Sequence, residues 1–331
     1  YLVRRSLGPL VQGMLPEQIV ALRVLDPSMG SGAFLVGACH YLAEAYAESL
    51  VVNGRCHATD LGPVEHTSIR RTVAERCLFG VDLNPMAVQL AQLSLWLTTL
   101  SADRPLGFLD HHLLAGNSLL GVWLSALRQP PKRRRTPHDT PLLADDPVTP
   151  MIRDLLPLRF SLNDGPTDTI AQVRRKERAL ADLSAADSLL SRWKRIADLW
   201  VARWLSADLD NLSSLFPALA DTILTGHGAL STRTATPFLQ RAAAVADVHR
   251  PFHWELEFPE VFFTSDGQRR ADGGRHLLSL RVLHVLHEVQ GDGGQVRLVA
   301  AEEQGRGRWS SGADRRDPHR VVLGRQDGDR K

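Results

Sequence analysis

The sequence lacks long hydrophobic runs. No window approaches the roughly eighteen uninterrupted apolar residues of a membrane-spanning helix, so we expect no contact with a membrane. No basic stretch followed by an apolar segment lies near Tyr1, so no secretory signal is expected. The first residue is not Met, which leaves open that the chain begins inside a larger gene product. The 331 residues suffice to bury a core without disulfides.

Cysteine is scarce. The three thiols, Cys39, Cys56 and Cys77, are odd in number and show no C-x-x-C spacing. This pattern favours reduced thiols in a cytoplasmic protein. We therefore expect no metal site, although His40 and His57 follow two of the cysteines directly.

An excess of one charge is also missing. The formal net charge is only +2, so bulk charge gives no argument for binding nucleic acid. A basic run at 132–135 falls in a stretch rich in Pro, Asp and Thr, 125–165, which predicts a loop or linker. The run either lies in solvent or touches a phosphate backbone, and we favour solvent.

Residues 1–124 alternate strand-like and helical runs, which predicts an α/β fold with a parallel sheet and crossover helices. We expect strands at 21–26, 77–82 and 112–115 and helices at 33–48 and from Asn84 onward. Asn84 precedes Pro85, as at a helix N-terminus, and residues 49–75 are expected to loop out. The second helix carries an apolar stripe expected to face the sheet, made of Met86, Leu90, Leu93, Leu97 and Leu100.

The rest of the chain contains three segments that differ in composition and pattern. Apolar spacings of 3 and 4 predict one long helix over 171–205, whose tryptophans we interpret as core rather than as base-stacking platforms. Residues 248–263 are aromatic and are expected to be extended. Residues 275–331 lack Phe, Tyr, Ile, Met, Cys, Asn and Thr but hold ten Arg and eight Gly. Such a shift suggests a frame-disrupted end or, alternatively, an internal deletion.

The strongest local signal is the segment DPSMGSGAF at 26–34, between a predicted strand and a predicted helix. Gly30 and Gly32 permit a tight turn that a ligand can approach closely, and the helix beyond offers unpaired N–H groups. The segment is neither GxGxxG nor a phosphate-binding GK[ST] loop, which weakens the nicotinamide and ATP interpretations. A tight turn without a ligand is the alternative.

Two further polar residues follow predicted strands. Asp82 is able to accept both hydroxyls of a ribose, or simply to cap the following helix. Asn117 offers an amide that suits an adenine edge, or serves only as a turn residue.

Four segments in order resemble the large adenine-specific DNA methyltransferases of type IIG restriction–modification and of phage-growth-limitation (BREX) systems. They are DPSMGSGAF, FGVDLNPMAV at 79–88, AGNSLLG at 115–121 and FHWELEFPEVF at 252–262. The resemblance implies an incomplete Rossmann-like sheet with a large helical insertion, and S-adenosylmethionine as cofactor. It divides the chain into a cofactor-binding half, a linker with the helical insertion, an approach to the catalytic strand and an atypical tail, at 1–124, 125–248, 249–274 and 275–331.

The resemblance also implies roles for single residues. Asp26, Gly30 and Gly32 would contact the methionine part of the cofactor, with Phe34 packing alongside and Pro27 as a further cofactor-binding residue. Asp82 would hold the ribose and Asn117 the adenine. The implied partners are double-stranded DNA and other subunits of a defence system.

The catalytic tetrapeptide of that family, Asn/Asp-Pro-Pro-aromatic, is missing. The single Pro-Pro pair, at 130–131, has Gln129 and Lys132 beside it and lies in the wrong region. No catalytic residue is therefore assigned. Two interpretations remain: a DNA adenine methyltransferase or its amino-terminal part, inactive alone, and a non-catalytic cofactor-binding remnant or accessory module. A methyltransferase for small molecules or proteins is a third class, which the last of the four segments disfavours.

Overall fold

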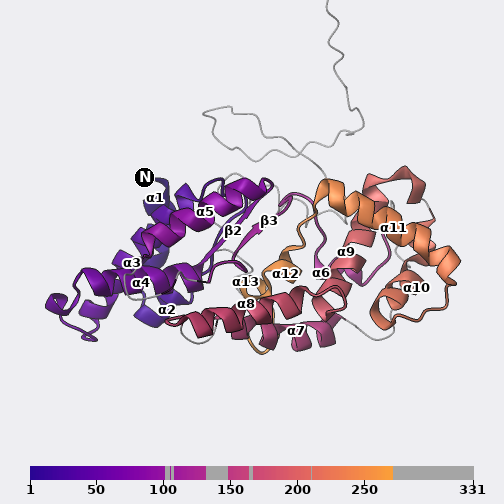
Figure 1. Ribbon diagram of the computed structural model, residues 1–331. Helices are drawn as coiled ribbons and strands as arrows, with labels where there is room; N and C mark the ends of the chain where they lie inside the picture. The colour runs from indigo at the N-terminus through magenta and orange to yellow at the C-terminus, as the bar shows by residue number, and fades with distance from the viewer. Residues whose placement is uncertain (101–104, 106–107, 132–147, 164–166, 210, 271–331) are drawn as a thin grey trace, which may run out of the picture. The chain divides into compact units, whose positions relative to one another are not determined.

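The computed structural model describes residues 1–100, 105, 108–131, 148–163, 167–209 and 211–270. A small parallel sheet organises the first part of this range (Figure 1). Its elements in chain order are α1 Leu2–Val11, α2 Pro16–Val20, β1 Val24–Asp26, α3 Ala33–Val52, the 3-10 turn η1 Ala58–Asp60, α4 Pro63–Cys77, β2 Leu78–Asp82, α5 Pro85–Thr98 and β3 Leu113–Ala115.

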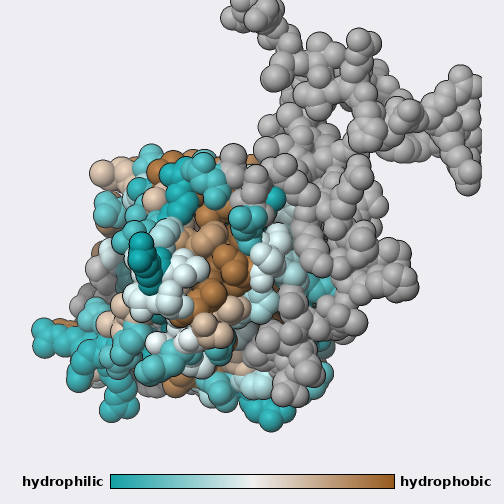
Figure 2. Space-filling model, turned by 90° about the vertical axis from the view of Figure 1, so that its right-hand side faces the viewer, coloured by the Kyte–Doolittle hydropathy of each residue, from teal (hydrophilic) through white to brown (hydrophobic). Residues whose placement is uncertain are grey.

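The second part is helical. It contains α6 Leu124–Leu127, α7 Val148–Asn163, α8 Ile170–Ser184, α9 Leu189–Leu205, the 3-10 turn η2 Ala207–Leu209, α10 Leu212–Thr225, α11 Thr232–His249, α12 Trp254–Glu257 and α13 Pro259–Phe262. Figure 2 looks onto the end formed by α10 and α11 and shows hydrophobic residues gathered in the middle of that face, with hydrophilic residues around them.

The three strands lie in the order β1-β2-β3, and both neighbouring pairs are parallel. Both faces of the sheet are covered, which explains why the strands are apolar runs rather than alternating ones. Val24 and Leu78 face a core built with α1 to α5, whereas Leu25 and Phe79 face a second core built with α7, α9 and the segment 252–263. The α/β expectation is confirmed at this level, as a small parallel sheet in a mostly helical chain.

The apolar stripe expected to face the sheet is exposed instead, and that prediction is wrong. The exposed fractions are 60% for Met86, 46% for Leu90, 48% for Leu93, 64% for Leu97 and 57% for Leu100. The buried stripe of α5 is Val88, Ala91 and Leu95. The reason is steric: α5 approaches the turn at Gly32 so closely that a Cβ there would lie 3.0 Å from the Cβ of Ala91. Only a small side chain fits at this contact.

Several predicted boundaries also change. The helix expected over 171–205 is two helices, because the side chain of Ser188 caps α9 by accepting a hydrogen bond from the N–H of Ser191 at 3.1 Å. Residues 49–75 do not loop out, since α3 continues to Val52 and α4 follows.

Two stretches of the helical part also differ from expectation. The stretch predicted as a linker contains α7, and the aromatic segment 252–263 folds into the short helices α12 and α13 rather than an extended run. Trp193 and Trp200 are core residues as predicted, with exposed fractions of 4% and 8%. The basic run 132–135 and the tail 275–331 lie outside the described residues.

The turn after β3 packs tightly against Phe252. A Cβ on Gly121 would overlap the carbonyl oxygen of Phe252, which is backbone and cannot swing away. We therefore expect Gly121→Ala to lower the free energy of unfolding by about 2–3 kcal/mol in urea titrations. Gly8→Ala is the control, because Gly8 lies inside α1 and its Cβ would meet only the flexible hydroxyl end of Tyr41. That variant should be neutral or more stable, and equal losses in the two variants would contradict the packing argument.

Candidate functional site

Polar residues meet at the carboxyl edge of the sheet. Asp26 ends β1 and Asp82 ends β2, while Asn117 follows the end of β3 by two residues. Because the strands are parallel, these ends lie along one edge, and Asp82 pairs in register with Ala115 on the neighbouring strand. The sequence thus places three predicted site residues at the edge where open α/β sheets bind their ligands.

The glycine-rich turn reaches over to β2. The backbone N–H of Gly30 donates a hydrogen bond to Oδ2 of Asp82 at 2.9 Å, and the N–H of Met29 donates to the carbonyl of Val81 at 3.0 Å. Gly30 has φ +55°, and no atom lies within 4 Å of the position a Cβ would take. A ligand is therefore free to approach the backbone at Gly30.

Gly32 has a different task in this turn. Its φ is +81°, a left-handed conformation, and its open side faces Ala91 of α5 rather than empty space. It also forms the N-cap of α3. The glycine thus lets the turn, α3 and α5 come together, which sets the position of the N–H groups at the start of α3.

Asp26 is buried at the base of the turn. Its Oδ1 accepts a hydrogen bond from the N–H of Ser28 at 3.0 Å, and its exposed fraction is 6%. Burial raises the pKa of this carboxyl, and the nearby charge of Asp82 adds in the same direction while the Ser28 N–H opposes it. Pro27 is buried beside it, and Phe34 is half-buried against the core around α3.

Asp82 is half-buried, and backbone N–H groups orient both of its oxygens. Oδ1 accepts from the N–H of Asn84 at 2.9 Å while Oδ2 holds Gly30. Asn84 in turn caps α5 by accepting a hydrogen bond from the N–H of Met86 at 3.0 Å, as predicted. Each carboxylate oxygen has a second lone pair, so Asp82 remains able to accept hydrogen bonds from a diol.

Asn117 is hydrogen-bonded to Arg250, the residue that follows α11. Its N–H donates to the carbonyl of Arg250 at 2.7 Å, and its Oδ1 accepts from the N–H of Leu119 at 3.2 Å. Arg250 is the single non-glycine residue with positive φ, +47°, in the part of the chain that the structure describes. The strain marks a junction where the helical part meets the sheet edge.

A pocket of about 450 Å³ opens at this junction, and no local sequence pattern predicts it. Its lining joins the sheet edge to α9 and α11 and consists of Pro85, Ala115, Asp198, Ala246, Asp247, Arg250 and Pro251. The aromatic segment 252–263 that follows Pro251 was the available hint, because it packs beneath the same edge.

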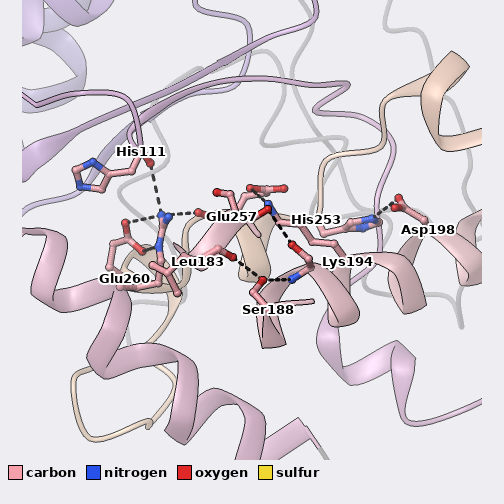
Figure 3. A network of polar contacts seen from close by, with 11 residues as sticks. His111, Leu183, Ser188, Lys194, Asp198, His253, Glu257 and Glu260 are labelled. Atoms are coloured by element: carbon pink, nitrogen blue, oxygen red, sulfur yellow. Dashed lines mark hydrogen bonds and ion pairs between the residues drawn. The ribbon is translucent and has the colours of Figure 1, made fainter. Parts of the chain in front are cut away.

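Hydrogen bonds and ion pairs anchor that aromatic segment to the helices, as Figure 3 shows. His253 contacts Asp198 of α9 at 3.0 Å, and Lys194 of α9 contacts Glu257 at 2.8 Å. Arg159 of α7 pairs with Glu260 at 3.0 Å. The aromatic residues of this segment stand out in the sequence, whereas its polar anchors carry no local sequence signal.

Two of the three thiols, Cys39 and Cys77, are buried. Burial raises the pKa of Cys39 to about 12 and that of Cys77 to about 11. Within the described ranges no group of three or more His, Cys, Asp or Glu residues is arranged to hold a metal ion. Over the same ranges, no helix has both the length and the apolar character required to traverse a lipid bilayer.

A family comparison identifies the class of domain. Residues 11–113 match the family model described as "MmeI, DNA-methyltransferase domain". The range includes the glycine-rich turn and Asp82 and ends before Asn117. Over this range the chain is similar to a methyltransferase domain of the restriction–modification type, and the resemblance to type IIG enzymes is confirmed at this level.

One curated relative agrees with this class. A protein of Methanocaldococcus jannaschii, named "putative type II restriction enzyme and methyltransferase", is 26% identical over 117 residues. The match covers 33% of this chain and 9% of that protein. The chain therefore spans only a small part of its relative's length. No solved structure matches the chain.

Proposed function

We propose that this chain is the S-adenosylmethionine-binding part of an adenine-specific DNA methyltransferase from a restriction–modification or phage-defence system. The observation that carries the proposal is the hydrogen bond between the N–H of Gly30 and Asp82 at 2.9 Å. It joins two segments far apart in sequence at the carboxyl edge of the sheet, inside the range that matches a DNA-methyltransferase domain. The sheet is then the first half of a Rossmann-like fold.

The residues present suit the chemical groups of this cofactor. The open space beside Gly30 admits the methionine part next to a buried Asp26, with Pro27, Gly32 and Phe34 shaping the turn. The carboxylate of Asp82 accepts hydrogen bonds from the ribose diol, and Asn117 offers an amide to the adenine. When bound, S-adenosylmethionine supplies a sulfonium methyl group. The residues named here bind and orient it.

The division of labour along the chain is part of the proposal. Residues 1–124 bind the cofactor, 125–248 form a linker and helical insertion, and 249–274 lead toward a catalytic strand. An Asn/Asp-Pro-Pro-aromatic segment, which would hold a flipped adenine of double-stranded DNA, is absent from the 331 residues. We therefore propose that the chain binds its cofactor in the cytoplasm but transfers no methyl group by itself. Other subunits of the system would supply the missing part.

Asp82→Ala tests the cofactor site. We expect the 331-residue chain to bind S-adenosylmethionine in calorimetry, and the variant to bind about 100-fold more weakly because it loses charge-assisted hydrogen bonds to the ribose. Asp82→Asn keeps one acceptor for the N–H of Gly30 and should lose less affinity. Asp60→Ala, on the exposed turn η1, is the control and should leave affinity unchanged. Equal affinity of Asp82→Ala and the parent chain would refute the ribose assignment.

A methyl-transfer assay tests the proposal that the chain transfers no methyl group by itself. Incubation of the purified chain with double-stranded DNA and tritiated S-adenosylmethionine should leave the DNA unlabelled. Labelled DNA would show that the chain is a complete methyltransferase despite the missing tetrapeptide. A chain that is folded but binds no S-adenosylmethionine would overturn the proposed function as a whole.

A further inference from the structure

The pocket of about 450 Å³ adjoins the proposed cofactor edge at the end of β3. Ala115 lines it and is the register partner of Asp82. Pro85, the first residue of α5, lines it from the same side. Pro251 also lines the pocket and forms a β-bridge with Asn117. A nucleoside whose ribose lies on Asp82 therefore has this pocket beside it, next to Ala115, to receive its base.

Asp198 is the carboxylate that α9 brings to this pocket. Its Oδ1 lies 3.0 Å from Nε2 of His253, a side chain with an exposed fraction of 2% (Figure 3). The N–H of Val122 points at Nδ1 of the same ring at 3.3 Å, so Nδ1 is the acceptor. Nε2 then carries the hydrogen that it donates to Asp198. The buried His253 ring thus orients the carboxylate of Asp198, whose side chain keeps an exposed fraction of 23%.

Asn117 presents the complementary group. Its Oδ1 accepts the N–H of Leu119, which orients the amide, and its Nδ2 carries two hydrogens that it is able to donate to a ligand. The Watson–Crick edge of adenine carries an acceptor, N1, beside a donor, the exocyclic amine. Asp198 lines the pocket and supplies a carboxylate acceptor, and Asn117, bridged to the lining residue Pro251, supplies an amide donor, which matches that pair of groups.

We propose that Asp198, positioned by His253, selects the adenine of the methyl donor by accepting a hydrogen bond from its exocyclic amine. The inference rests on the proposed function and adds to it a specificity residue from the helical part of the chain. Asp247 and Arg250 also line the pocket, but both are exposed at its rim. Asp247 therefore serves as the matched control for a carboxylate that is near the base but not oriented by a buried partner.

The test compares two ligands on one preparation of the 331-residue chain. S-adenosylhomocysteine carries the amine, and S-inosylhomocysteine carries an oxygen in its place and a hydrogen on N1. We expect the parent chain to prefer the adenosyl ligand by at least about tenfold in calorimetry, since the inosyl ligand leaves Asp198 facing an oxygen. In Asp198→Asn the amide donates to that oxygen, so the ratio of the two affinities should fall by about tenfold. Because the ratio is taken within one preparation, partial unfolding does not alter it.

The outcomes separate the two proposals. Asp247→Asn should keep the parent's ratio. If Asp198→Asn also keeps it while the parent binds S-adenosylhomocysteine, the inference is overturned and the proposed function stands. If the folded parent chain binds neither ligand, the proposed function fails and the inference fails with it.

Discussion

Glu260→Ala is expected to destabilise the protein by about 3–5 kcal/mol, because it leaves the guanidinium of Arg159 buried without its counter-charge. The exposed fractions of the two side chains are 3% for Arg159 and 0% for Glu260, and the closest N–O distance is 3.0 Å. Both charges of this ion pair are therefore almost completely removed from solvent.

The same guanidinium connects three segments. Nη2 of Arg159 donates to the carbonyl of Glu257 at 2.6 Å, and it lies 3.5 Å from the carbonyl of His111 just before β3. Removing Glu260 therefore loosens the attachment of α13 to α7 and to the second core. Since Phe258, in the same segment, packs edge-on against Phe79 of β2 at 5.3 Å, the effect should reach the sheet.

Urea unfolding followed by circular dichroism measures the loss. Arg55→Ala is the control, because its pair with Glu17 is exposed at both ends, 62% and 65%, and should change the free energy of unfolding by less than about 1 kcal/mol. The double variant Arg159→Met with Glu260→Met should recover much of the stability, since no unpaired charge stays buried. Equal effects of Glu260→Ala and Arg55→Ala would contradict the burial of this pair.

A loss of stability in mild acid is the second large effect that we expect. His111 and His112 are buried side by side before β3, with exposed fractions of 1% and 0%. Their Nε2 atoms lie 2.7 Å and 2.9 Å from the same oxygen, Oδ1 of Asn163 in α7. An amide oxygen only accepts, so each ring donates through Nε2. Burial is the main reason that the pKa of His112 is lowered to about 3, and it likewise lowers the pKa of His111 well below its usual range.

The direction of the change in stability with pH follows from the difference in proton binding between the folded and unfolded states. Both histidines stay neutral in the folded state, whereas the unfolded chain binds protons as the pH falls below about 6.5. The stability is therefore complete above that pH and declines below it, toward about 3 for His112, by about 1.4 kcal/mol per pH unit for each histidine. The raised pKa of Asp26 and of Glu255 works in the opposite direction at lower pH.

Unfolding free energies between pH 7 and pH 5 measure this slope. His112→Gln is the informative variant, because a glutamine amide keeps a donor for Asn163 and does not titrate. We expect its slope to be smaller by the contribution of one histidine. An unchanged slope in His112→Gln would show that other groups cause the acid sensitivity.

The sequence predicted the sheet edge well because its signals are local. A glycine-rich turn after an apolar run, an acid at the end of the next run and an Asn-Pro helix start each act within a few residues. Those signals placed Asp26 and Asp82 at strand ends, and parallel pairing then brings the ends together. The roles of the individual residues toward a ligand stay predictions.

The failures concern contacts that local patterns do not encode. The leucines of α5 form a regular stripe, but the helix turns its small Ala91 toward Gly32, because that approach excludes larger side chains. The break between α8 and α9 depends on a hydrogen bond from Ser188 to the carbonyl of Leu183 at 2.7 Å as well as on its cap. Apolar spacing continues through such a break, so periodicity alone does not reveal it.

The pocket beside Ala115 is a third case. Its charged residues, Asp198 of α9, Asp247 of α11 and the following Arg250, all lie more than 80 residues after Ala115 in sequence. Asp198 has no motif around it, and only the fold brings it near Asn117 through Pro251. Long-range packing of this kind is set by the tertiary structure rather than by any local pattern.

A crystal structure of the chain grown with S-adenosylhomocysteine tests the central claim most directly. The account predicts the ligand along the carboxyl edge of the sheet, with its amino-acid part beside Gly30, its ribose on Asp82 and its adenine in the pocket between Ala115 and Asp198. A crevice that stays empty at saturating ligand, or a ligand bound elsewhere on the chain, would contradict it.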